Sequence, residues 1–232
     1  MIRFKDEDFK KIIENFFEYL KNKKIVLYNE FSFQHELGKY LNENTNYKVE
    51  FERNISKFIN PEEIKNKYEN NYDEKEEKIK REIDICLINK ENQEDRYAIE
   101  LKFPSNDQYP EQMYKFVKDI KFMQVLKKEC FEKTFCVVVA RSKAFYLGSH
   151  QGRNKTINPY IFSYFRNEDG DNVCTKKINC AKPIFKPTGK AEERTQVTLL
   201  ENVEFKWEEV PYANVILEDI KDTPMYYIIE MK

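Results

Sequence analysis

Two acidic residues and one lysine stand out because they interrupt apolar stretches of the chain. Asp84 lies within the apolar run 83–88, and Glu100 and Lys102 lie within the run 97–103. If both runs are strands, Glu100 and Lys102 project from the same face. If the strands also pair as a hairpin, Asp84 lies beside Glu100. A pair of carboxylates is an oxygen-ligand site suited to Mg²⁺ or Mn²⁺, and the neighbouring lysine can stabilise charge on a phosphate.

A simpler interpretation of these residues is a solvent-facing strand. In a chain with 35% charged residues, a Glu-x-Lys pattern alone often marks the exposed face of a half-covered sheet. The apolar context favours a site instead, because an unpartnered carboxylate in such a strand has a large free-energy cost.

The elements that must position these residues follow from hydrophobic periodicity. Between 61 and 82 the chain is rich in both acids and bases, which favours a solvated helix or a mobile insertion. The expected elements are helices at 6–21 and 30–43, a strand at 47–55, paired strands at 83–88 and 97–103, a helix at 110–128 and a buried strand at 134–140. From residue 30 onward this order is helix, strand, strand, strand, helix, strand.

The carboxyl-terminal part has a looser pattern. Glycine, proline and aromatic residues recur between 148 and 190, which favours loops. Later strands are expected at 196–210, 212–217 and 225–231. No linker is evident, so the sequence predicts one domain over 1–232, with a core at about 30–140 and a loop-rich, β-rich extension at about 141–232.

The spacing of Asp84 and Glu100-Leu101-Lys102 within this order of elements resembles the PD-(D/E)xK nuclease superfamily, which has the restriction-endonuclease-like fold. The chain departs from the motif at Ile83, where the superfamily has proline. The resemblance covers about 30–140. It implies an α/β fold with a central mixed sheet flanked by helices, metal ligands at Asp84 and Glu100 with the Leu101 carbonyl as a third, and a catalytic lysine at Lys102.

The resemblance also directs attention to the two flanking helices. Glu36 lies at the margin of the apolar stripe of helix 30–43, where it is either a metal ligand or water-positioning residue, or a charge on the helix surface. Glu52 is a weaker candidate, and His35 is expected to face solvent. In helix 110–128, Gln124 interrupts an apolar stripe and needs a polar partner, which the site would provide.

Net charge excludes a uniformly basic protein, because 40 basic residues stand against 41 acidic ones. The charges are nevertheless uneven along the chain. Between 141 and 190 ten basic residues stand against three acidic ones, whereas between 191 and 232 the counts are four and ten. Basic residues interleaved with aromatic ones suit phosphate contact and base stacking. The candidate nucleic-acid-binding residues are Lys121, Arg141, Lys143, Arg153 and Lys155, although a surface loop with ordinary charge scatter fits equally well.

Cysteine and histidine usage argues against other classes of site. The five cysteines are scattered, without a Cys-x-x-Cys pair, and only two histidines occur, so neither a zinc site nor a disulfide framework is expected. No apolar run approaches the roughly 18 residues that span a bilayer. We therefore expect a cytoplasmic protein that does not associate with membranes.

Taken together, the sequence predicts a Mg²⁺- or Mn²⁺-dependent nuclease that hydrolyses DNA, of the restriction or mobile-element type, with RNA not excluded as a substrate. A chain that cuts both strands of a duplex would act as a homodimer. One alternative is a nuclease-like DNA-binding or scaffold protein without activity. A second is an α/β protein in which Glu-x-Lys is a coincidence, and carboxylates of Asp84 and Glu100 more than about 8 Å apart would support it.

Overall fold

The computed structural model describes residues 8–69, 78–104, 109–148, 160–167, 175–187 and 194–232. A six-stranded mixed sheet runs through the molecule in the order β1-β2-β3-β4-β10-β9. Its strands are β1 (Tyr47–Asn54), β2 (Glu82–Asn89), β3 (Arg96–Lys102), β4 (Lys133–Ala140), β10 (Met225–Glu230) and β9 (Glu208–Glu209). Only β3 and β4 pair in parallel, and the other neighbours are antiparallel.

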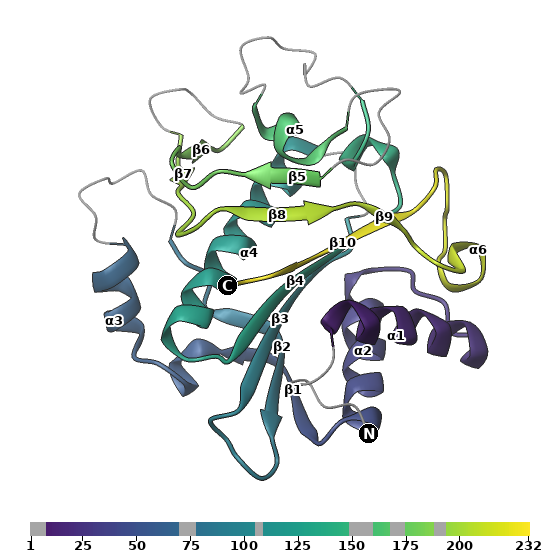
Figure 1. Ribbon diagram of the computed structural model, residues 1–232, viewed down its shortest axis with the longest axis horizontal. Helices are drawn as coiled ribbons and strands as arrows, with labels where there is room; N and C mark the ends of the chain where they lie inside the picture. The colour runs from purple at the N-terminus through teal and green to yellow at the C-terminus, as the bar shows by residue number, and fades with distance from the viewer. Residues whose placement is uncertain (1–7, 70–77, 105–108, 149–159, 168–174, 188–193) are drawn as a thin grey trace.

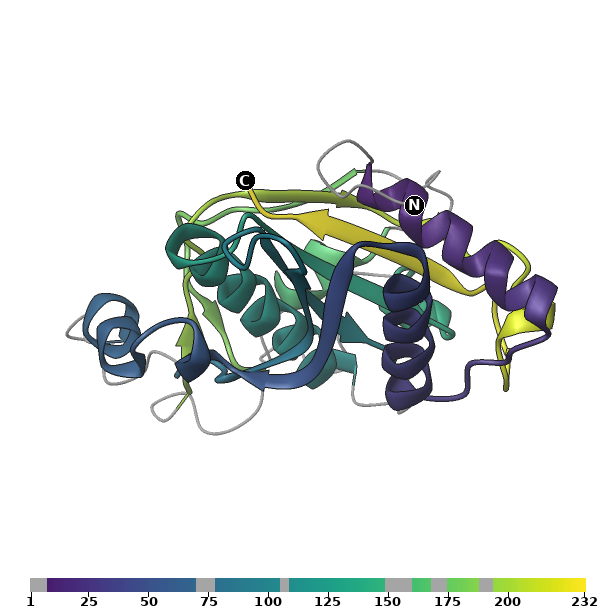
Figure 2. The same ribbon diagram turned by 90° about the horizontal axis from the view of Figure 1, so that it is seen from below.

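Helices cover both faces of this sheet. Helices α1 (Phe9–Lys23) and α2 (Glu30–Asn44) lie on one side, and α4 (Tyr109–Glu129) lies on the other (Figures 1 and 2). Along β3 the side chains alternate between the faces: Ile99 and Leu101 pack with α1 and α2, whereas Ala98 packs with α4. Glu100 and Lys102, which share the parity of Ala98, therefore face α4.

The helix beside the site is fixed at its start by a capping box. The side chain of Asn29 accepts a hydrogen bond from the Ser32 main chain, and the Ser32 hydroxyl accepts one from the Asn29 main chain. Further along α2, a Cβ atom added to Gly38 would clash with the ring of Phe51. Glycine at this position therefore lets α2 lie directly against β1.

The segment before β2 is only partly helical. It contains α3 (Pro61–Ile64) and a π-turn, η2 (Lys65–Glu69), and residues 70–77 lie outside the described part of the chain. The expected solvated helix is thus present over its first two turns. Residues 78–81 then lead without regular structure into β2.

The carboxyl-terminal part completes the sheet and adds two small antiparallel pairs, β5 with β8 and β6 with β7. The strands of these pairs are β5 (Thr175–Ile178), β6 (Ile184–Phe185), β7 (Gln196–Val197) and β8 (Val203–Lys206). The other short helical elements within the described residues are η1 (Ile55–Lys57), η3 (Lys143–Phe145), α5 (Tyr160–Phe165) and α6 (Ala213–Ile216). The prediction of a strand at 212–217 is wrong. Tyr212 has a left-handed backbone (φ 59°) and precedes the helical turn α6, in which Ile216 is buried and Val215 is exposed.

The central prediction of the fold is confirmed in its coarse form. The elements α2, β1, β2, β3, α4 and β4 follow the order expected from the sequence, within two residues at each boundary. In the described ranges, no helix is long and apolar enough to span a membrane.

Candidate active site

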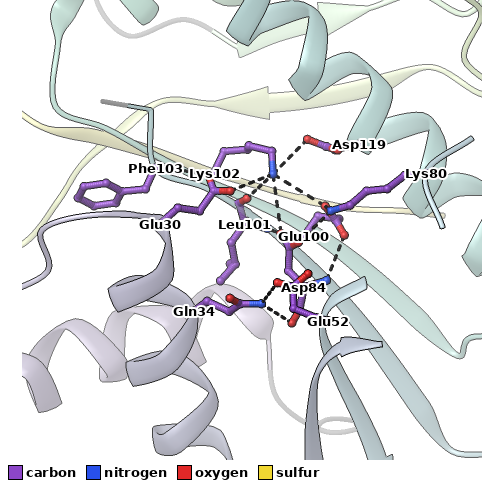
Figure 3. Close-up of polar contacts among 10 residues, drawn as sticks. All are labelled: Glu30, Gln34, Glu52, Lys80, Asp84, Glu100, Leu101, Lys102, Phe103 and Asp119. Carbon is purple, nitrogen blue, oxygen red and sulfur yellow. Dashed lines mark hydrogen bonds and ion pairs between the residues drawn. The ribbon is translucent and has the colours of Figure 1, made fainter. Parts of the chain in front are cut away.

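Asp84 and Glu100 lie where the pairing between β2 and β3 stops. The last paired residues are Ile85 and Ile99, and the same register continues to Asp84 opposite Glu100. There, side chains take over the main-chain partners: Asp84 Oδ2 accepts from the Leu101 amide at 2.8 Å, and Glu100 Oε1 accepts from the Asp84 amide at 3.2 Å (Figure 3). One oxygen of each carboxylate is therefore held by the backbone of the opposite strand.

The second oxygen of each carboxylate contacts Lys80. The Lys80 ammonium lies 2.8 Å from Asp84 Oδ1 and 2.6 Å from Glu100 Oε2. These two oxygens are therefore no farther apart than the sum of the two distances, well within the limit of about 8 Å for sharing one ion. Both acidic residues are buried, with 7% and 1% of their surface exposed. The separation of more than about 8 Å that would support a coincidental Glu-x-Lys pattern is therefore not found.

Lys102 lies among the same acids (Figure 3). Its ammonium donates to the Leu101 carbonyl at 2.7 Å. Its carboxylate neighbours, at 3.5 to 4.0 Å, are Glu30, Asp119, Asp84 and Glu100. The Leu101 carbonyl, expected as a third metal ligand, is thus directed into the cluster.

Helix α2 contributes Glu30 and Gln34 to the cluster. Glu30 Oε2 accepts from the Phe103 amide at 3.0 Å, which ties the start of α2 to the end of β3. One helical turn later, Gln34 Nε2 donates to the Asp84 carbonyl at 2.7 Å and to Glu52 Oε1 at 2.6 Å. The i, i+4 spacing of Glu30 and Gln34 was a usable signal, because at about 100° per residue Glu30 lies as close to Phe33 as Glu36 does, about 60° away.

Glu36, by contrast, is not brought to the cluster. Its ion contact is with His35 at 3.9 Å, and its charge acts on Tyr19 of α1. His35 is exposed, as expected. At about 100° per residue, Glu36 is rotated by some 200° from Gln34, and this rotation turns it away from Asp84.

Glu52 occupies an unusual position opposite Asp84. The β1–β2 register pairs Phe51 with Ile85 and Arg53 with Ile83, which puts Glu52 opposite Asp84. Glu52 has a left-handed backbone with φ 47°, a conformation with a steric cost for any residue but glycine. Backbone strain of this kind concentrates at functional sites.

Helix α4 contributes Asp119 rather than Gln124. Asp119 is buried, and its Oδ2 has no hydrogen-bond partner within the described residues, only the ion-pair contact with Lys102. Gln124 is buried as predicted, but its amide bonds the main chain of Glu201 and Leu200 at 2.9 and 2.8 Å. Its partner is thus the carboxyl-terminal segment, not the site.

Burial controls the ionisation of the acids. It raises the pKa of Glu100 well above the ordinary value, and the charges of Asp84 and Asp119 raise it further. Burial also raises the pKa of Asp119. Burial alone would raise the pKa of Asp84 too, but Lys102 and Lys80 outweigh it and hold that pKa below the ordinary value.

Both lysines remain cationic. Burial alone would lower the pKa of Lys102, but Asp119 and Glu100 raise it well above the ordinary value. Glu100 and Asp84 likewise raise the pKa of Lys80, again against burial. At neutral pH, Lys102 is therefore a hydrogen-bond donor and a positive charge, not a base.

A cavity of about 640 Å³ opens at this cluster. Glu30, Lys102 and Asp119 line it together with residues that bring further positive charge, namely Lys78, Lys80, Lys115 and Lys118. The buried Asp119 carboxylate and the Lys102 ammonium, which contacts Asp84 and Glu100, thus lie in a cavity with a lysine-rich rim. Such an arrangement suits a cation at the base and an anionic group above it.

The other basic candidates lie elsewhere. Lys121 is buried, with 5% of its surface exposed, and does not present a surface to nucleic acid. Arg141 donates to the Glu218 carbonyl at 2.8 Å and stacks over the Phe103 ring, and Lys143 pairs with Asp222. The two remaining candidates, Arg153 and Lys155, lie outside the described residues.

A divalent ion would have two carboxylates and one carbonyl as protein ligands. Within the described ranges, no group of three or more His, Cys, Asp or Glu side chains is arranged to hold a metal. Asp84, Glu100 and the Leu101 carbonyl form an all-oxygen set, which fits Mg²⁺, an ion that commonly takes one or two carboxylates and completes its shell with water or substrate phosphate. The buried Asp119 carboxylate beside Lys102 adds negative charge that favours a cation here.

Neither the family models nor the curated proteins nor the solved structures contain a match to this chain. A function can therefore be inferred only from the geometry of the side chains at Asp84, Glu100 and Lys102.

Proposed function

We propose that the chain is a divalent-metal-dependent nuclease that hydrolyses phosphodiester bonds of DNA, with a restriction-endonuclease-like core of the PD-(D/E)xK type. One observation carries the proposal: Asp84 and Glu100 converge on Lys102, and Lys102 lines a cavity with a lysine-rich rim. The order α2-β1-β2-β3-α4-β4 supports the same assignment. A nuclease of the restriction or mobile-element type fits this core best.

The residues of the chain have distinct tasks in this reaction. Asp84, Glu100 and the Leu101 carbonyl would hold Mg²⁺ or Mn²⁺, which when bound polarises a phosphate and lowers the pKa of a water. Lys102 stays protonated and donates to a phosphate oxygen, where negative charge develops in the transition state. Asp119 orients the Lys102 ammonium from α4.

The rim binds the substrate. Lys115 and Lys118 lie on α4, and Lys78 precedes β2, so the basic groups reach the cavity from two separate segments of the chain. Phosphate contacts of this kind position a nucleic acid without reading its sequence. Glu30 ties the start of α2 to Phe103, and both residues line the same cavity.

The test is hydrolysis of plasmid, linear and single-stranded DNA, and of RNA, with Mg²⁺ or Mn²⁺. We expect Asp84→Asn, Glu100→Gln and Lys102→Met each to lower the cleavage rate by about a hundredfold or more, because each removes an ion ligand or a charge needed in the transition state. Glu94→Gln, in the exposed turn between β2 and β3, is the matched control and should cut like the wild type. Undiminished cleavage by Asp84→Asn or Lys102→Met would refute the site.

A second candidate function is a nuclease-like protein that binds DNA without cutting it. It is favoured by one observation, the Lys80 ammonium between the two carboxylates that would hold the ion. This candidate predicts DNA binding in EDTA and no cleavage of any substrate with Mg²⁺ or Mn²⁺. Metal-dependent cleavage that disappears in Asp84→Asn would exclude it.

A further inference from the structure

Lys80 contacts the two carboxylate oxygens that the backbone leaves open. Asp84 Oδ2 and Glu100 Oε1 are bound by main-chain amides, and Lys80 takes Asp84 Oδ1 and Glu100 Oε2. Figure 3 shows the Lys80 side chain reaching this pair from outside the sheet. The ammonium therefore occupies the oxygens that a divalent ion would need.

The residues on either side of Lys80 are anchored, whereas the Lys80 side chain reaches the cavity. The Ile79 amide donates to Glu69 Oε1 at 2.9 Å, and the Arg81 guanidinium donates to the same oxygen at 2.8 Å. Ile79 is also buried. The Lys80 side chain, by contrast, is 29% exposed and lines the cavity.

We propose that Lys80 is an exchangeable counter-ion of this site. In the ion-free chain its ammonium neutralises Asp84 and Glu100, and it leaves for the lysine-rich rim when a divalent cation binds. The two cannot share the same oxygens, because at hydrogen-bond distances the repulsion between an ammonium and a dication is large. At the rim, Lys80 contacts a phosphate of the nucleic acid. The inference rests on the proposed function, because it assigns the same ion and the same substrate.

The exchange links ion binding to nucleic-acid binding. While Lys80 is bound to the carboxylates, its positive charge is not available to a phosphate. Once it is released, the rim gains a cation, so ion and nucleic acid strengthen each other's binding. Lys78 lines the same cavity, but among the described residues it makes no ion pair with Asp84 or Glu100, which makes it the matched control.

The first test measures Mn²⁺ affinity by electron paramagnetic resonance without nucleic acid. We expect Lys80→Met to bind Mn²⁺ about tenfold more tightly than the wild type, because the competing ammonium is gone. Lys78→Met should match the wild type, and Lys80→Arg, which retains the charge, should stay close to it. Equal or weaker Mn²⁺ binding by Lys80→Met, or no Mn²⁺ binding by either protein, would overturn the proposal, and circular dichroism verifies that each variant is folded.

The second test measures binding of a fluorescent DNA duplex by anisotropy, in EDTA and in Ca²⁺. We expect Ca²⁺ to increase the affinity of the wild type and of Lys78→Met about tenfold, and that of Lys80→Met much less. An equal increase in Lys80→Met would contradict the exchange. Neither test depends on cleavage, so the exchange can hold even if the chain cuts no substrate, and it can fail even if the chain is a nuclease.

Discussion

At the scale of single residues, the site contains more acidic side chains than basic ones. Four carboxylates, from Glu30, Asp84, Glu100 and Asp119, surround the ammonium groups of Lys80 and Lys102. Burying such a set is costly unless every charge is compensated. Burial raises the pKa of Glu100 and of Asp119, and a cation bound beside these carboxyls would favour their charged forms and oppose that rise.

Gln124 provides a prediction about stability rather than catalysis. Gln124→Ala should lower the free energy of unfolding by about 1–3 kcal/mol, because the Leu200 amide and the Glu201 carbonyl lose a buried partner. Urea denaturation measures this change, and Lys128→Ala, at an exposed position of the same helix, should change it by less than about 0.5 kcal/mol. If Gln124→Ala has the stability of the wild type but cleaves DNA more slowly, Gln124 acts in the active site after all.

Glu52 provides a second prediction at this scale. Glu52→Gly should raise the free energy of unfolding by up to about 1 kcal/mol, because glycine adopts a positive φ without steric cost. The same substitution at Lys48, which pairs regularly with Ile88 in the same strand, should lower it. Thermal and urea denaturation of both variants give the comparison. If Glu52→Gly is clearly destabilised, the bond from Gln34 matters more than the backbone strain.

At the scale of elements, the site depends on where the hydrogen-bonded pairing of β2 with β3 ends. The β2–β3 pairing stops at Ile85 and Ile99, and the parallel pairing of β3 with β4 continues through Lys102. The β3 strand is thus held on one side while its other side is free to receive the Asp84 side chain. Helices α2 and α4 then bring Glu30 and Asp119 to Lys102 from opposite faces of the sheet.

Strand β1 carries an ion network around Glu50, and the contribution of this network to the free energy of unfolding depends on pH. Burial alone would raise the pKa of Glu50, but hydrogen bonds from Lys57 and Lys48, with the charge of Arg53, outweigh it and hold the pKa below the ordinary value of 4.5. A lowered folded-state pKa stabilises the fold above the unfolded-state value, and this stabilisation is lost as the pH falls through the folded-state value.

Glu50→Gln should therefore lower the free energy of unfolding by about 1 kcal/mol at neutral pH. The difference from the wild type should vanish below the folded-state pKa, where the Glu50 carboxyl is protonated in both states. Urea denaturation over a pH series measures both proteins. A difference that persists unchanged in acid would show that packing, not charge, accounts for it.

At the scale of the whole molecule, the fold rearranges the charges seen along the chain. The basic segment 141–190 meets the acidic segment 191–232 through Lys143 with Asp222 and Lys177 with Glu204. Part of its excess charge is thereby neutralised within the described residues. The lysines at the cavity come from other segments of the chain, so positive charge gathers at a place that regional counting does not indicate.

The salt dependence of DNA binding distinguishes these two basic regions. The double variant Lys115→Ala/Lys118→Ala should reduce the slope of log affinity against log salt by about two, because each lysine that neutralises a phosphate contributes about one to that slope. The double variant Lys143→Ala/Lys177→Ala removes the same charge from paired positions and should leave the slope unchanged. Titrations by fluorescence anisotropy at several salt concentrations measure it. If only Lys143→Ala/Lys177→Ala reduces the slope, the nucleic acid binds over 141–190 instead.

What the sequence by itself determined is local. Periodicity of two in the strands located Asp84, Glu100 and Lys102 and put the last two on one face, because alternation in a strand depends only on the backbone. The order of elements in the core followed from the same patterns. The short carboxyl-terminal elements were less predictable, since runs of a few apolar residues fit a helical turn such as α6 as well as a strand.

Only the tertiary structure decided which other side chains meet at the site. Lys80 lies within the charged segment 61–82, which favoured a solvated helix or a mobile insertion, and nothing in its local pattern indicates two buried acids as partners. Gln124 and Asp119 share one helix, yet packing against the carboxyl-terminal segment takes the first away from the site and places the second beside Lys102. Contacts between elements depend on how their faces pack in space, and a pattern along one element does not contain that information.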